Sequence, residues 1–342
     1  MKILYSGYHN PNFMAITEYV ERAILQLGYD LETYDYRQHI IPYRISDNIP
    51  MLKRWDKNRL NSRLIKLVDR FRPDIFLGNW GGSYYPETIT EIKKRYNAIT
   101  INWLIDFPGE PGALEAAIEA VPPYDYFFAQ STDALEVHAE HGNKGGMWLN
   151  AACDPDIHKP LKLTEEEKKQ YGSDVSFVGS MYPERVELFE TLTDFDLGIW
   201  GPGWKNLDTD SPLRKHIKGG SVTPDIWIKI YNASKIVVNY MGNYGENIKE
   251  ENVYQASPRV FETMSCGSFQ IVDAKRDVVS LFEPGEHLVC FKKINEVKNL
   301  VKYYLDHPQE RMKIAQKGHS EVLEKHTYVH RVKELLKAIG KI

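Results

Sequence analysis

Residues 257–272 read Ser-Pro-Arg-Val-Phe-Glu-Thr-Met-Ser-Cys-Gly-Ser-Phe-Gln-Ile-Val, and this stretch decides the fold. Ser257 is typical of a helix N-cap, and Pro258 suits the first helical turn, where its missing N–H is not needed. Gly267 predicts the end of that helix, and the apolar run after it predicts a buried strand. A helix that leads directly into a buried strand is the building unit of parallel α/β sheets.

Short apolar runs alternate with longer amphipathic stretches on both sides of this unit, which predicts two successive series of strands and helices. The expected strands are 2–6, 74–77, 98–105, 126–129, 146–149, 174–178, 197–200, 235–239, 269–272 and 287–291. The expected helices are 10–27, 60–71, 183–192, 224–232, 258–265, 294–305 and 309–325. For the first helix, Asn10 is the expected N-cap with Pro11 next, and Gly28 the expected stop.

Two α/β series of similar size predict two doubly wound domains that face each other across a cleft, residues 1–152 and 153–325. Between them, residues 151–167 contain two prolines and an acidic run, as expected of a linker. The charged stretch 165–169 is expected to be a solvated helix face rather than a functional motif.

Composition excludes several classes of protein. The chain of 342 residues is 42% hydrophobic and 26% charged, with a formal net charge of −4, so it lacks the basic excess typical of nucleic-acid binding. It shows no long apolar run of the kind found in signal peptides or membrane spans. Its three cysteines are widely spaced and read as free thiols in a reducing compartment. We therefore expect a cytoplasmic protein without a membrane span.

The start of the helix at Ser257 is a candidate anion site. Free backbone N–H groups at a helix N-terminus attract negative charge, and Arg259 adds a bidentate donor for a phosphate. Glu262 lies one turn deeper, within reach of ribose hydroxyls if phosphates sit at the helix end. The spacing of three residues is equally typical of an Arg259–Glu262 ion pair on the helix surface, so both interpretations stay open.

The pattern R-x-F-E-x-x-x-x-G, formed by Arg259, Phe261, Glu262 and Gly267, resembles the GT-B glycosyltransferases, particularly the CgeB-like (spore-maturation) group. In the broader retaining families two glutamates stand eight positions apart, and the second contacts the nucleotide ribose. Glu262 matches the second, whereas the first falls on Tyr254, which is not acidic. The stretches 281–287 and 326–331 resemble later motifs of the same group.

This resemblance implies a GT-B fold whose C-terminal domain binds a nucleoside-diphosphate sugar and whose last helix, 326–342, crosses back to the N-terminal domain. Arg185 would reach the pyrophosphate, or is a surface arginine at a helix start; Gly201 would border the base pocket, or only makes a turn. No cofactor or metal is expected, although Asp208-Thr209-Asp210 spells the metal-binding pattern of the other large glycosyltransferase fold. The implied donor-binding residues are Gly179, Ser180, Arg185, Gly201, Ser257, Pro258, Arg259 and Glu262.

The resemblance is looser in the N-terminal half, where residues 102–108 look like the group's W-x-x-D-x-P motif. Asp106 follows a predicted central strand, at the edge where open α/β sheets place ligands, and is a candidate base or orienting group for the acceptor, or a turn residue. His9 is the second candidate catalytic residue. The residues expected on the acceptor side are Gly81, Gly82 and Trp103.

The predicted function is sugar transfer from a nucleoside-diphosphate sugar to an acceptor hydroxyl in the interdomain cleft, without metal. The acceptor is a glycan, protein, small molecule or modified nucleic acid. Two alternatives stay open: a nucleotide-sugar epimerase or hydrolase of the same fold, and a non-catalytic nucleotide-sugar-binding module.

Overall fold

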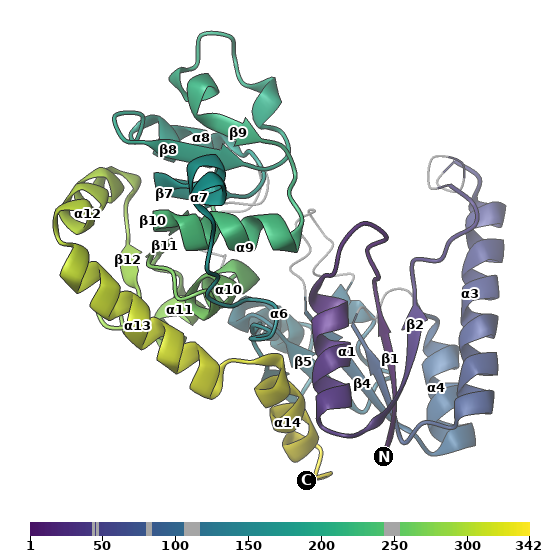
Figure 1. Ribbon diagram of the computed structural model, residues 1–342. Coiled ribbons are helices and arrows are strands. Elements are labelled where there is room, and N and C mark those ends of the chain that lie inside the picture. Colours follow the sequence, from purple (N-terminus) through teal and green to yellow (C-terminus); the bar gives the residue numbers. More distant parts are fainter. Residues whose placement is uncertain (43–44, 46–47, 80–83, 106–116, 243–253) are drawn as a thin grey trace. The chain divides into compact units, whose positions relative to one another are not determined.

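The computed structural model describes residues 1–42, 45, 48–79, 84–105, 117–242 and 254–342. The chain divides into two compact units, residues 1–150 with 331–342, and residues 151–330 (Figure 1). Each unit is built on a parallel six-stranded sheet flanked by helices. The predicted class, two doubly wound α/β halves, is confirmed.

The first unit has the strand order β2-β1-β3-β4-β5-β6. Its strands are β1 (Lys2–Gly7), β2 (Asp30–Asp35), β3 (Ile75–Gly78), β4 (Ile99–Leu104), β5 (Tyr126–Ala129) and β6 (Gly146–Trp148). Its helices are α1 (Ile16–Gln26), α3 (Pro50–Phe71), α4 (Pro86–Tyr96), α6 (Thr132–Glu140) and most of α14 (Tyr328–Ala338). The sequence patterns missed β2, because this edge strand is polar and mostly only half-buried.

The predicted start of the first helix is wrong. The Asn10 side chain accepts a hydrogen bond from the backbone N–H of Asn12 at 2.9 Å, which closes a local turn instead of capping a helix. The helix begins later, at Ile16, where the Glu18 carboxylate accepts from the Ala15 N–H at 2.8 Å. Its predicted end is confirmed, since Gly28 follows the C-cap with a φ of 77°.

The second unit has the strand order β12-β11-β10-β7-β8-β9. Its strands are β7 (Ser173–Val178), β8 (Leu197–Trp200), β9 (Ile217–Gly219), β10 (Ser234–Asn239), β11 (Gln270–Asp273) and β12 (Val289–Phe291). Its helices are α7 (Glu165–Tyr171), α8 (Pro183–Glu190), α9 (Pro224–Ala233), α10 (Pro258–Ser265), α11 (Arg276–Leu281), α12 (Ile294–Asp306) and α13 (Pro308–Lys325). All five helices predicted in this unit are confirmed within two residues at each end.

The expected linker, 151–167, is only partly a connector. Cys153 is fully buried in the second unit, and its backbone pairs with the segment before α14. The Cys153 N–H donates to the His326 carbonyl at 3.1 Å, and its carbonyl accepts from Tyr328 at 3.0 Å. The acidic stretch further along forms α7, which buries no residue, so the expected solvated helix face is confirmed.

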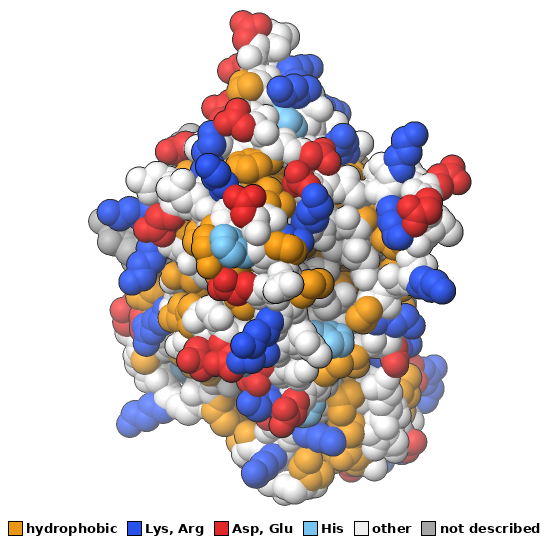
Figure 2. All heavy atoms as spheres, turned by 60° about the vertical axis from the view of Figure 1, so that its left-hand side comes forward, with side chains coloured by type: hydrophobic (Ala, Val, Ile, Leu, Met, Phe, Trp, Pro, Cys, Tyr) orange, Lys and Arg blue, Asp and Glu red, His pale blue; other side chains and the backbone are white. Residues whose placement is uncertain are grey.

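The surface carries charges of both signs. Lys and Arg side chains are interspersed with Asp and Glu over the face seen in Figure 2. In the described part of the chain, no helix combines the length and the apolar character needed to cross a membrane.

Candidate functional site

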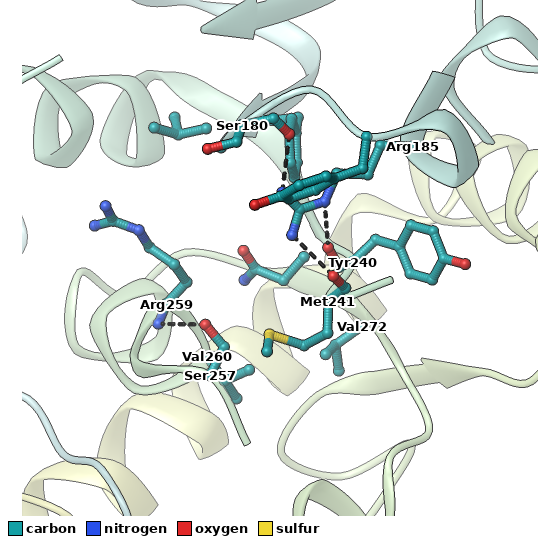
Figure 3. A pocket seen from close by; sticks show the side chains of 13 residues that line it. Ser180, Arg185, Tyr240, Met241, Ser257, Arg259, Val260 and Val272 are labelled. Carbon is teal, nitrogen blue, oxygen red and sulfur yellow. Dashed lines mark hydrogen bonds between the residues drawn. The ribbon is translucent and has the colours of Figure 1, made fainter. Parts of the chain in front are cut away.

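A pocket of about 200 Å³ opens at the carboxyl ends of β7 and β10 in the second unit (Figure 3). Doubly wound sheets bind their ligands at this edge, because the loops that follow the strands converge there. The pocket brings together five of the predicted donor-binding residues, and Tyr240 and Met241 also line it. The five are Gly179, Ser180, Arg185, Ser257 and Arg259.

Helix α10 forms one wall of the pocket and begins as the sequence predicts. The Ser257 hydroxyl accepts a hydrogen bond from the Arg259 N–H at 3.3 Å, and Pro258 occupies the first turn. At the other end, Gly267 has a φ of 70° and terminates the helix. The capped N-terminus therefore faces the pocket with the positive end of the helix dipole.

Arg259 and Glu262 form the ion pair that the spacing suggested, but the carboxylate is buried rather than on the surface. Nη1 of Arg259 lies 2.6 Å from Oε2 of Glu262, whose side chain is 5% exposed. The guanidinium also lies 3.7 Å above the Trp227 ring. The Arg259 side chain is 31% exposed. Its guanidinium therefore compensates the charge of the buried Glu262 carboxylate and also presents an oriented cation at the start of the helix.

A fully buried histidine lies behind Glu262. Nε2 of His158 is 3.8 Å from Oε1 of Glu262, and Nδ1 accepts from the Asp154 N–H at 3.1 Å. Burial lowers the pKa of His158, which favours the neutral ring. Sequence reasoning missed this histidine because it lies 104 residues before Glu262 in the sequence.

Arg185 holds the pocket together from within the protein. Its Nε donates to the Tyr240 carbonyl at 2.9 Å, and its Nη2 to the Met241 carbonyl at 3.0 Å. Its Nη1 donates to the Ser180 carbonyl at 2.9 Å (Figure 3), and the guanidinium packs against the Phe177 ring. The side chain is thus not the surface arginine of one interpretation: it is buried, it lines the pocket, and three of its five N–H groups bond to these carbonyls. It ties the loop after β7 to the loop after β10.

Gly179 and Gly201 allow the loops after β7 and β8 to touch. The Gly179 N–H donates to the Trp200 carbonyl at 2.9 Å, and its carbonyl accepts from the Trp204 indole at 2.8 Å. A Cβ on Gly201 would lie only 1.9 Å from the Gly179 carbonyl oxygen, and Gly201 has a φ of 144°. Gly201 does not line the pocket; it shapes the pocket by letting Gly179 take its position.

Asp273, at the end of β11, is a further polar group beside the site that the sequence patterns missed. Its Oδ1 accepts from the Met241 N–H at 3.3 Å, and its Oδ2 lies 3.8 Å from Nζ of Lys275. Burial raises the pKa of this carboxyl to about 6. A carboxylate directly after a buried strand is the signal that would have found it.

The raised pKa of Asp273 predicts a specific pH dependence of stability. The folded protein binds a proton at Asp273 more tightly than the unfolded chain, so its free energy of unfolding falls as the pH rises from about 4 to about 6. The expected change is roughly 2 to 3 kcal/mol. Asp273→Asn keeps an acceptor for Met241 and should remove this slope in urea unfolding across that pH range. An identical slope in wild type and variant would contradict the assignment.

Of the predicted site residues in the first unit, His9 and Trp103 lie in the described part of the chain. His9 shares a 2.6 Å hydrogen bond with Glu21, and this bond raises the pKa of the imidazole, so a larger fraction of the ring is protonated near neutral pH. Trp103 is fully buried, and its indole donates to the Leu149 carbonyl at 3.0 Å, so the structure gives it a packing role. Asp106, Gly81 and Gly82 lie outside the described residues.

The pattern Asp208-Thr209-Asp210 lies in a loop between two short 3₁₀ helices, Trp204–Asn206 and Pro212–His216, and is exposed. In the ranges that the structure covers, no three His, Cys, Asp or Glu side chains gather in a way that could hold a metal ion.

Comparisons with known proteins agree with this geometry. Residues 185–337 match the family described as "Glycosyl transferase-like". The spore protein CgeB of Bacillus subtilis (strain 168) is 23% identical over 270 residues, which cover 76% of this chain and 81% of CgeB. The predicted resemblance to the CgeB-like group is therefore confirmed.

Solved structures show the same fold over the whole chain. HepE of Anabaena, crystallised in complex with UDP-glucose, superimposes with a TM-score of 0.68 at 12% identity, covering 100% of both chains. Sucrose-phosphate synthase of Thermosynechococcus elongatus gives a TM-score of 0.71 at 11% identity, covering 99% of this chain and 98% of its own. These superpositions show the GT-B fold, and residues 185–337 are similar to the glycosyl transferase-like family.

Proposed function

We propose that this protein is a glycosyltransferase that moves a sugar from a nucleoside-diphosphate sugar to an acceptor hydroxyl. The observation that carries the proposal is the pocket at the start of α10, where Arg259 and the capped helix N-terminus supply positive charge. HepE, which shares the fold, was solved with UDP-glucose, so UDP-glucose is the first donor to test.

In this proposal the diphosphate binds at the N-terminus of α10. Negative charge that develops on the leaving diphosphate is stabilised by the backbone N–H groups of the helix and by Arg259, without a metal ion. Glu262, which the resemblance places on the ribose, is 5% exposed and paired with Arg259, so in this proposal it holds the Arg259 guanidinium in place, with His158 3.8 Å from its other oxygen. Asp106 and His9 remain candidates for the group that accepts the proton of the acceptor hydroxyl.

Product analysis separates this function from its alternatives. The purified protein is incubated with UDP-glucose and a set of hydroxyl acceptors, and the products are resolved by mass spectrometry. A glycosylated acceptor supports the proposed transfer. An isomerised or free sugar formed without acceptor would indicate an epimerase or hydrolase instead. Binding of the donor without any product would indicate a binding module.

Arg259→Ala is expected to weaken UDP binding by about 10- to 100-fold, because a charge-assisted contact to phosphate contributes roughly 1.5–3 kcal/mol. Isothermal titration calorimetry with UDP measures the loss. The substitution also leaves Glu262 buried without its partner, so the double variant with Glu262→Gln is the control for repulsion by that carboxylate. Unchanged UDP affinity in Arg259→Ala would exclude Arg259 from the phosphate site.

A further inference from the structure

Exposed apolar side chains gather at one end of the first unit. Five of the eleven large hydrophobic side chains that stand exposed in the described residues lie within residues 40–55. Met51 is 75% exposed and Trp55 51% exposed. We call these five residues the apolar patch: Ile40, Ile45, Ile49, Met51 and Trp55.

Polar contacts hold the patch in place. Met51 and Trp55 are four residues apart in α3 and therefore share one face of the helix. The loop that carries Ile40 is fixed to α3 by Asp56, which accepts from the Ile40 N–H at 3.2 Å. Asp56 also lies 2.8 Å from Nε of Arg59 and 3.0 Å from Nδ1 of His39. The backbone at Ile40 is therefore fixed to the helix that carries Met51 and Trp55.

The helix that carries the patch is strongly basic. Helix α3 contains seven Lys or Arg residues and two Asp residues, a net charge of +5, whereas the whole chain has a net charge of −4. Arg54, Arg63 and Lys66 are among its exposed cations. Positive charge is thus concentrated on the element that also displays Met51 and Trp55.

The patch lies at the carboxyl-end edge of the sheet in the first unit. Helix α3 follows β2 and packs beside a parallel sheet, so its N-terminus lies at the carboxyl ends of the strands (Figure 1). Doubly wound sheets place their ligands at this edge.

We propose that the apolar patch and the cations of α3 dock the protein on an anionic lipid bilayer. Met51, Trp55 and the neighbouring isoleucines enter the headgroup region, where Trp is favoured, while Lys and Arg contact the anionic headgroups. The proposal concerns attachment to a surface and is independent of donor binding in the second unit.

A bilayer fits these observations better than a nucleic acid or a protein partner. A nucleic acid would use the cations but leave the five apolar side chains without a role. The centres of protein interfaces are depleted in Lys, whereas helix α3, which displays Met51 and Trp55, carries Lys53, Lys57 and Lys66.

Co-sedimentation of the full chain with vesicles tests the proposal. Wild type should sediment with vesicles of phosphatidylcholine and phosphatidylglycerol, less so at high salt, and should stay in solution with phosphatidylcholine alone. Met51→Ser combined with Trp55→Ser should weaken binding to anionic vesicles by about tenfold or more. Arg63→Gln combined with Lys66→Gln should weaken binding and flatten its salt dependence.

The control is Met312→Ser, which removes a 61% exposed methionine from α13 in the second unit and should bind vesicles like wild type. All variants should keep the thermal midpoint and UDP affinity of wild type. The proposal is wrong if wild type stays in solution with anionic vesicles, or if the Met51/Trp55 variant sediments like wild type. It is also wrong if wild type binds soluble polyphosphate as tightly as vesicles and the Met51/Trp55 variant keeps that binding, because the partner would then be a polyanion.

Discussion

Gly201→Ala is expected to destabilise the second unit by about 3 kcal/mol or more. The backbone of Gly201 has a φ of 144°, which residues with a side chain rarely adopt, and the new methyl carbon would lie only 1.9 Å from the Gly179 carbonyl oxygen. Because that oxygen belongs to the backbone, relief requires the loops after β7 and β8 to separate. The separation would break the 2.8 Å hydrogen bond from Trp204 to Gly179 and distort the pocket.

Urea unfolding of wild type and variant measures this effect, with UDP titration as the second readout. Gly220→Ala is a matched control, because a Cβ there meets nothing within 4 Å and Gly220 has no positive φ. We expect the control to stay within about 0.5 kcal/mol of wild type. Equal unfolding midpoints for Gly201→Ala and Gly220→Ala would show that the two loops do not pack as described.

Arg185→Met is expected to have the second large effect, a loss of about 3 kcal/mol or more in stability together with loss of donor binding. Methionine fills much of the same space but leaves the carbonyls of Ser180, Tyr240 and Met241 without their charged donor. The loop after β10 would then lose its link to the loop after β7. Arg185→Lys should recover only part of the loss, since one ammonium group lacks the forked geometry that serves three carbonyls.

Unfolding in urea and UDP affinity together identify the role of Arg185. A positioning role predicts that stability and affinity fall together, whereas a direct phosphate ligand would lower affinity while stability remains near that of wild type. Glu187→Gln, at an exposed position of the same helix, is the control and should change neither. A variant Arg185→Met as stable as wild type would contradict the role assigned here.

Local sequence signals predicted the second unit well. Helices α8, α9 and α10 each begin at a proline in the first turn, and α10 ends where Gly267 adopts a positive φ. These features depend on neighbouring residues only, so the sequence reveals them. The same reasoning failed at Asn10, whose side chain bonds to Asn12 instead of capping a helix. It also missed β2, because an edge strand can be polar.

The candidate site was predictable in its location and less so in its chemistry. Ser257 and Arg259 carry a recognisable motif, and the structure places both in the pocket. The partners of Arg185 lie 55 and 56 residues away in the sequence, so no local pattern shows that its donors are occupied. The steric need for glycine at position 201 likewise arises only when the loops after two neighbouring strands meet.

The central claim, that the second unit binds a nucleoside-diphosphate sugar, is tested most directly by titrating the protein with UDP-, GDP-, dTDP- and CDP-sugars. Calorimetry is performed first without metal and then with magnesium, on wild type and on Arg259→Ala. The account predicts saturable binding of one nucleotide class without metal, weakened by about 10- to 100-fold in Arg259→Ala. Absence of binding to every nucleotide sugar under both conditions, or equal binding by the two proteins, would contradict it.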